Sequence, residues 1–212
     1  SWEEFARRIN GELVAGWGNL VNRTASMIAK SFGEIPQPGE LQEVDRALLE
    51  AVRGGYATVG GLLERFRNRQ ALAEAMRLVS EANAYISTTE PFKLKGAENA
   101  ERLATVLWTC AQAVTELNTL LSPFLPHTAN EVEKALGGDA VIAPLPRVEE
   151  VTDLDDPSVS YPVITGDYTV GVRWEPRDVT VGAPVAKPTP IFRKLDDEAV
   201  ARERELTTAS GE

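Results

Sequence analysis

The chain has 212 residues, of which 43% are hydrophobic and 25% are charged, and its formal net charge at pH 7 is −10. These values predict a globular protein with one large domain or a domain with an appendage. No apolar run approaches the about 18 residues of a membrane span, which excludes a membrane-spanning protein. The single cysteine, Cys110, excludes an internal disulfide, so we expect a reducing, cytoplasmic location. The chain starts at Ser1 without an initiating Met and without a signal peptide, which suggests a piece of a longer polypeptide.

The negative charge is unevenly distributed along the chain. Residues 1–138 carry 14 Lys and Arg against 17 Asp and Glu, whereas residues 139–212 carry 8 against 15. A nearly neutral domain can bind a few nucleotides through local contacts, but it releases too few counterions to bind polyanions strongly and without specificity. We therefore expect neither a DNA partner nor a membrane partner.

Five helices are predicted in residues 1–138, because apolar residues recur there every three or four positions between proline and glycine breaks. In the first of them, Asn10-Gly11 favours a break. Short connections predict antiparallel neighbours, so the fold class is an all-α antiparallel helix bundle. The predicted helices are residues 2–32, 41–67, 70–89, 99–121 and 127–136.

The sequence changes character after Gly138. Residues 139–192 contain eight prolines and no helical period. We expect a Pro/Asp-rich extended tail that lies along the bundle, with at most a small β-hairpin formed by residues 168–174 and 178–181. A helix is predicted again at residues 196–205. The predicted organisation is therefore a bundle, residues 1–138, followed by a C-terminal segment, residues 139–212.

Asn19 and Arg23 lie four residues apart and share one helical face, with Asn22 beside them. An amide can read a base edge, and a guanidinium can pair with a base or a phosphate in a planar fork. The spacing alone also fits a structural alternative, in which Asn19 caps a local break near Gly18 and Arg23 pairs with a carboxylate.

Phe92 and Lys93 follow Pro91 where the third predicted helix ends. An exposed ring at such a position can stack on an unpaired base, which is worth roughly 1–3 kcal/mol. The alternative is that Phe92 folds back into the core.

The remaining polar residues predict no self-contained active site. Arg65, Arg67 and Arg69 either neutralise a helix C-terminus or contact phosphate. The one histidine, His127, has no neighbours at metal-ligand spacing, and no glycine-rich phosphate loop is present. We therefore predict no catalytic residue, no metal site and no cofactor in this chain.

Four ordered segments resemble the anticodon-binding helical domain of methionine–tRNA ligases, in its actinobacterial version. The first is Trp17-Gly18-Asn19-Leu20-Val21-Asn22-Arg23-Thr24, and the second runs from Glu81 through Asn83 and Tyr85 to Pro91-Phe92-Lys93. The other two are Leu121-Ser122-Pro123-Phe124-Leu125-Pro126-His127-Thr128-Ala129 and Pro190-Ile191-Phe192-Arg193-Lys194-Leu195-Asp196. The resemblance covers about residues 2–197.

This resemblance implies a module that recognises the CAU anticodon of methionine tRNA. Asn19 and Arg23 match positions that contact the first anticodon base and its neighbours, and Phe92 falls where the family usually has a stacking tryptophan. Ala15 falls where the family often has an asparagine, so the chain departs from the pattern at two positions. Asn22 and Lys93 complete the expected anticodon-binding set.

The resemblance also implies what this chain lacks. The ATP-binding signatures of the family, of the His-x-Gly-His and Lys-Met-Ser-Lys-Ser types, are absent from the sequence. ATP, and Mg with it, would therefore bind in a separate catalytic domain, toward which residues 139–212 would extend. The expected partners are the tRNA and that catalytic domain, and this chain alone is expected to be inactive.

Three other interpretations stay open at this point. The chain could be a helical scaffold for protein–protein interaction, a divergent paralogue that no longer reads tRNA, or the equivalent domain of a related ligase. An anticodon module predicts that Asn19, Arg23 and Phe92 meet at one exposed end of the bundle. A scaffold predicts that they are buried or scattered, with an exposed apolar patch elsewhere.

Overall fold

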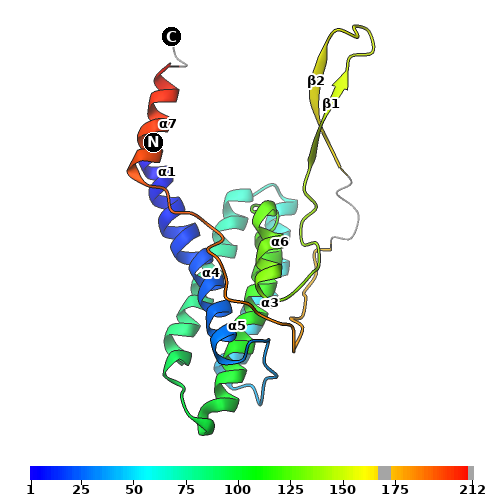
Figure 1. Cartoon of the computed structure of the whole chain (residues 1–212). Coiled ribbons are helices and arrows are strands. Elements are labelled where there is room, and N and C mark those ends of the chain that lie inside the picture. The colour runs from blue at the N-terminus through cyan, green and yellow to red at the C-terminus, as the bar shows by residue number, and fades with distance from the viewer. Residues whose placement is uncertain (167–172, 210–212) are drawn as a thin grey trace.

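A computed structural model describes residues 1–166 and 173–209 and consists mainly of antiparallel helices (Figure 1). The all-α bundle expected from the sequence is confirmed. The described helices are α1 (Trp2–Arg8), α2 (Asn19–Ser31), α3 (Glu43–Glu64), α4 (Asn68–Thr89), α5 (Ala100–Leu121), α6 (Pro126–Ala135) and α7 (Asp197–Ala209). In the described part of the chain, no helix is both long and apolar enough to cross a membrane.

Helix α5 is the centre of the bundle. It contacts α2, α3, α4 and α6, and every residue from Thr109 to Leu121 is buried. The largest buried side chains around it include Trp17, Leu20, Ile28 and Leu78. Because α5 is covered on all sides, the apolar stripes of the other helices all face inward, and their polar faces form the surface.

The predicted break near Asn10 is a change of helix type. The chain runs from α1 through a π-helical segment, Ile9–Gly18, directly into α2. The Asn10 amide binds the tail, since its Nδ2 donates to the Leu195 carbonyl at 2.7 Å and its Oδ1 accepts from the Leu195 amide at 2.9 Å. The polar residue that suggested a break therefore holds the C-terminal segment on the helix.

The β-hairpin lies in a different place from the one predicted. Strands β1 (Arg147–Thr152) and β2 (Ser160–Thr165) pair antiparallel and project away from the bundle (Figure 1). Residues 178–181 form no strand, because this segment bonds to the bundle: the Val179 amide donates to Gln112 Oε1 at 2.9 Å. Most of the other predicted strand, residues 168–172, lies outside the described residues.

Residues 173–195 of the tail lie along the bundle and bind to it at several points. The Trp174 indole donates to the Tyr56 carbonyl at 3.2 Å, and Ile35 exchanges backbone hydrogen bonds with Gly182 and Ala183. Further on, the Phe192 ring lies so close to Gly18 that an added Cβ would be 2.9 Å from a ring carbon. The tail is thus extended along the bundle over residues 173–195, as expected, but it also contains the projecting hairpin.

Helix α7 closes the structure by packing on α1. Trp2 Nε1 donates to Thr207 Oγ1 at 3.2 Å, and Arg204 forms an ion pair with Glu3 at 2.5 Å. The helix predicted at residues 196–205 is present and extends to Ala209. As a result, the first and last helices lie side by side at the upper left of Figure 1.

Candidate nucleic-acid interface

The first half of the candidate site lies at the start of α2. Asn19 is its first residue and is exposed, and Arg23, one turn later, is half-buried. Asn22 accepts a hydrogen bond from Ser26 at 3.4 Å. Because Leu20, Val21 and Thr24 are buried, the helix is fixed in rotation and its polar face stays outward.

Neither structural alternative for this face is found. Gly18 is helical, and the Asn19 side chain forms no hydrogen bond within the described ranges, so it caps no break. Arg23 forms no ion pair there either. Burial raises the pKa of the Cys110 thiol in α5 to about 12, and the Arg23 charge acts against this increase. Helix α2 packs against α5, and no carboxylate of the described residues pairs with the Arg23 guanidinium.

The second half of the site is the turn after α4. Glu90 adopts a left-handed conformation with φ of 44°, and residues Pro91–Lys93 then form one 3-10 turn. Pro91 is buried, whereas Phe92 is 52% exposed and lies outside the core, so the core alternative for this ring is wrong. Lys93 Nζ lies 2.7 Å from Glu90 Oε1, so its charge is already paired.

A hydrogen bond aligns the two halves along the bundle. Asn83 Nδ2 in α4 donates to the Gly16 carbonyl at 3.2 Å, just before α2 begins. Helix α3 runs antiparallel to both α2 and α4, so α2 and α4 run in the same direction. Arg23 lies seven residues after Gly16, and Glu90 lies seven residues after Asn83, which corresponds to about 10 Å along each helix. Both halves are therefore at the same end of the bundle, although their role in RNA binding stays a prediction.

A buried ion pair braces this end. Arg102 in α5 binds the Asp45 carboxylate of α3 through two hydrogen bonds of 2.5 and 2.9 Å, and the Tyr85 hydroxyl of α4 donates to it at 2.5 Å. Burial by itself would raise the pKa of Asp45, but these hydrogen bonds and the Gln42 amide lower it below its usual range. Burial and the Asp45 carboxylate both raise the pKa of Tyr85. The cluster joins three helices within two turns of Phe92.

A family model described as the anticodon-binding domain of tRNA ligase matches residues 45–163. This match covers more than half of the chain. The chain belongs to the family of tRNA-ligase anticodon-binding domains.

Within this family, the similar proteins are methionine–tRNA ligases. The methionine–tRNA ligase of Beutenbergia cavernae is 58% identical over 212 residues, and the match covers 99% of this chain but 34% of the relative. The ligase of a Nocardioides species is 56% identical over 206 residues, with 95% and 34% covered. The free form of Mycobacterium tuberculosis methionyl-tRNA synthetase superposes with a TM-score of 0.71 at 25% identity, covering 92% of this chain and 35% of that one. The resemblance to actinobacterial methionine–tRNA ligases is thus confirmed, and the chain spans about a third of the length of the curated relatives that it matches.

The anticodon-binding domain carries a second polar feature at the opposite end of α4. In the turn between α3 and α4, Arg65, Arg67 and Arg69 are all exposed, and so is Phe66. The sequence reasoning noted the arginines but missed the ring between them. An aromatic residue at the position after a helix C-terminus, where glycine is common, is the signal that could have found it.

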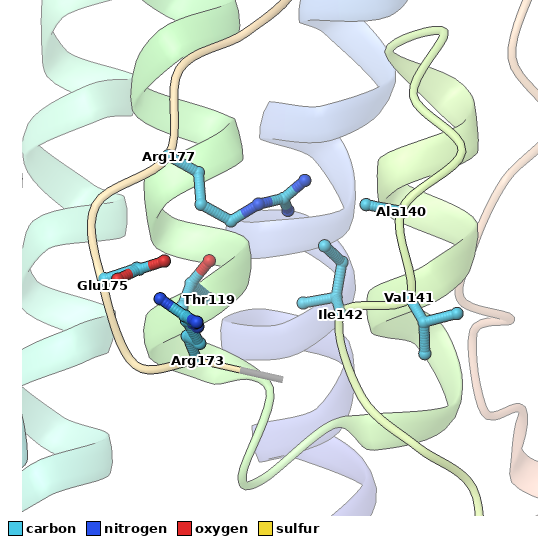
Figure 2. A pocket seen from close by; sticks show the side chains of 7 residues that line it. All are labelled: Thr119, Ala140, Val141, Ile142, Arg173, Glu175 and Arg177. Atoms are coloured by element: carbon cyan, nitrogen blue, oxygen red, sulfur yellow. The ribbon is translucent and has the colours of Figure 1, made fainter. Parts of the chain in front are cut away.

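A cavity of about 130 Å³ lies between the tail and α5, and Figure 2 shows its lining: Thr119, Ala140, Val141, Ile142, Arg173, Glu175 and Arg177. Its charges are mixed, and Arg177 is bound to Glu133 at 2.7 Å, so this cavity belongs to the packing of the tail. Across residues 1–166 and 173–209, no group of three His, Cys, Asp or Glu is arranged to hold a metal ion.

Proposed function

We propose that this chain recognises the CAU anticodon of methionine tRNA as part of a methionine–tRNA ligase. In this proposal Asn19 and Arg23 contact the first anticodon base and its neighbours, and Phe92 stacks on that base. Asn22 and Lys93 contact the adjoining backbone. The observation that carries the proposal is an exposed amide, an unpaired guanidinium and an exposed ring at one end of a domain from the anticodon-binding family.

The remaining part of such a ligase would perform the chemistry. We propose that a separate catalytic domain binds ATP and Mg, activates methionine and charges the tRNA in the cytoplasm. This chain would contribute recognition and no catalytic residue. Its length, about a third of that of the relatives, supports this division.

An apolar groove supports the catalytic domain as a protein partner. The groove has a volume of about 420 Å³ and lies between the N-terminal helix, α4 and the end of α5. Its apolar lining residues are Phe5, Ile9, Leu13, Leu72, Met76, Phe124 and Leu125. A scaffold protein would also expose an apolar patch, but it would not need exposed Asn19 and Phe92 at the far end. We propose that residues 139–212 extend toward the same catalytic domain.

The test is a binding titration at a stated salt concentration. The chain should bind an RNA stem-loop with a CAU anticodon more tightly than one with a changed anticodon. The Arg23→Ala variant should lose most of this preference, and Arg7→Ala, which removes an exposed arginine from α1, should keep it. Equal binding of both stem-loops by the unchanged chain would contradict the proposal.

In the complete ligase, Arg23→Ala should reduce tRNA charging and leave methionine activation nearly intact. An equal loss of both activities would argue against an anticodon role, because activation needs no tRNA contact at this site.

A further inference from the structure

The turn from Arg65 to Arg69, which we name the arginine turn, contains a strained and exposed phenylalanine. The Phe66 amide donates to the Leu63 carbonyl and the Arg67 amide donates to the Leu62 carbonyl, both at 2.9 Å. This is the hydrogen-bond pattern of a helix C-terminus that closes on a left-handed residue, which is usually glycine. Here that residue is Phe66, with φ of 56°. A side chain in this conformation costs free energy, so the fold itself would favour glycine.

The Phe66 ring makes no packing contribution that would offset this strain. Phe66 is 88% exposed, and it takes no part in the hydrophobic core. All residues from Glu64 to Gln70 are exposed, so the ring is surrounded by polar side chains. An exposed ring at a strained position is therefore better explained by a ligand than by packing.

Arg65 lies at the C-terminus of α3, where positive charge is favourable, but the other two arginines lie where it is unfavourable for the fold. Arg67 occupies the N-cap position of α4 without a side-chain capping hydrogen bond, and Arg69 lies in the first turn, where the helix dipole favours negative charge. In the described part of the chain none of the three arginines forms an ion pair, and the Arg65 guanidinium lies over Gly61 of its own helix. Glu64 is the one carboxylate between residues 64 and 69. A net positive patch thus persists in a chain whose overall charge is −10.

We infer that the arginine turn is a second RNA-binding site, at which Phe66 stacks on an unpaired base and Arg67 and Arg69 contact the flanking phosphates. Guanidinium groups match the geometry of phosphate groups. An aromatic ring among polar side chains can stack on a nucleic-acid base, because stacking does not require an apolar surface around the ring. A protein partner would instead favour an aromatic residue inside a larger apolar patch. This inference rests on the proposed function, because it assigns a second contact to the same RNA.

The two sites lie at opposite ends of α4. The helix has 22 residues, which corresponds to a separation of about 33 Å. The base held by Phe66 therefore belongs to a part of the tRNA outside the anticodon loop. Such a contact adds affinity without reading the anticodon.

The experiment compares two complete tRNA transcripts, one with a CAU anticodon and one with a changed anticodon, over a range of salt concentrations. Phe66→Gly should weaken binding of both transcripts about tenfold and leave the CAU preference unchanged. Phe66→Tyr, which keeps a ring, should bind like the unchanged chain. The double change Arg67→Gln and Arg69→Gln should weaken both transcripts and lower the slope of log K against log salt concentration by about 1–2.

Matched controls separate these effects from loss of folding or of charge. Phe66→Gly introduces the residue that the backbone favours, so its Tm should stay the same or rise by up to about 4 °C. Tyr161→Ala removes an exposed ring from the hairpin, and Arg147→Gln removes an exposed charge there. Neither control should change the affinity by more than about twofold, which is within the usual effect of a surface substitution.

The outcomes distinguish this inference from the proposed function. If the unchanged chain prefers CAU but the Phe66 and arginine variants bind like it, the second site is overturned, and the ring is assigned to a protein contact. If the chain shows no CAU preference but the variants still lose affinity, the second site stands and the anticodon proposal falls. If the chain binds neither transcript, both fall.

Discussion

Each end of α4 carries an exposed phenylalanine, but the two turns that hold these rings are built very differently. Phe66 precedes the helix, Phe92 follows it, and each lies in a turn that contains a residue with positive φ. Phe66 and Glu90 are the two non-glycine residues with this conformation in the described ranges. At the Phe92 end, the left-handed residue is Glu90, the next residue, Pro91, is buried, and Lys93 is paired with Glu90.

The two turns differ in how rigidly the rest of the fold holds them before a ligand binds. The buried Asp45 cluster ties α3, α4 and α5 together two helical turns before Phe92, so the backbone that carries this ring is braced before any ligand arrives. At the other end no ion pair among the described residues restrains the arginine turn, and the strain falls on Phe66 itself. The rigid site near Phe92 is suited to distinguishing one base from another. The less restrained arginine turn is suited to a contact that tolerates many base sequences.

The largest effect should come from removing the brace. Asp45→Asn leaves the Arg102 guanidinium without its carboxylate in a mostly buried position, so the free energy of unfolding should fall by about 3–5 kcal/mol. Urea unfolding followed by circular dichroism measures this change. Asp178→Asn removes an exposed carboxylate that lies 3.4 Å from Arg53, and it should change the stability by less than about 0.5 kcal/mol. Similar losses in both variants would show that the cluster is no brace.

The same brace should weaken in acid. The pKa of Asp45 is lower in the folded protein than the value of about 3.9 in an unfolded chain. Its contribution to stability is therefore fully present above about pH 3.9 and is lost as the pH falls through the folded pKa. The Tm difference between the unchanged chain and Asp45→Asn should shrink as the pH is lowered from 7 to about 3. A difference that stays constant over this range would contradict the assignment.

Phe92 gives a direct comparison with Phe66. Phe92→Ala should weaken binding of the CAU stem-loop by about 1–2 kcal/mol because a stacking face is lost. Phe92→Trp should bind at least as tightly as the unchanged chain, since tryptophan offers a larger face. Fluorescence anisotropy with a labelled stem-loop measures both. If Phe92→Ala binds as the unchanged chain does, the stacking role is wrong.

The smallest effect should come from Glu90. Glu90→Gly removes a side chain from a left-handed position, so the free energy of unfolding should rise by about 0.5–1 kcal/mol despite the loss of an exposed ion pair. Ala84→Gly, at an exposed helical position in α4, should lower it by about 1 kcal/mol. Chemical unfolding of the two variants should therefore shift in opposite directions. A shift in the same direction would mean that the backbone at Glu90 is not strained.

The helices could be predicted from the sequence because their signals are local. Apolar spacing and the breaks at Pro36, Pro91 and Gly137 predicted each helix of the bundle to within a few residues. The tail could not be predicted in the same way. Its backbone bonds to distant partners such as Gln112 and Ile35, and these contacts prevent residues 178–181 from pairing as a strand.

The candidate site could be predicted in part for the same reason. Asn19 and Arg23 share a face through helix geometry alone, but the alignment with Phe92 depends on the bond from Asn83 to Gly16, 67 residues away. The brace joins residues 40 and 57 positions apart in sequence, which no local pattern reveals. The residue type places an aromatic ring after the C-terminus of α3, but the left-handed backbone of Phe66, with φ of 56°, depends on the hydrogen bonds that close the turn and is seen only in the structure.

The pairing of α1 with α7 has a consequence for engineering. Since the two helices leave the fold side by side, a short peptide could join them without disturbing the bundle. New termini could then be opened at Asp155 and Asp156, in the exposed tip between β1 and β2. Such a circular permutant should keep every interhelical contact, and it would allow a reporter to be attached far from both ends of α4.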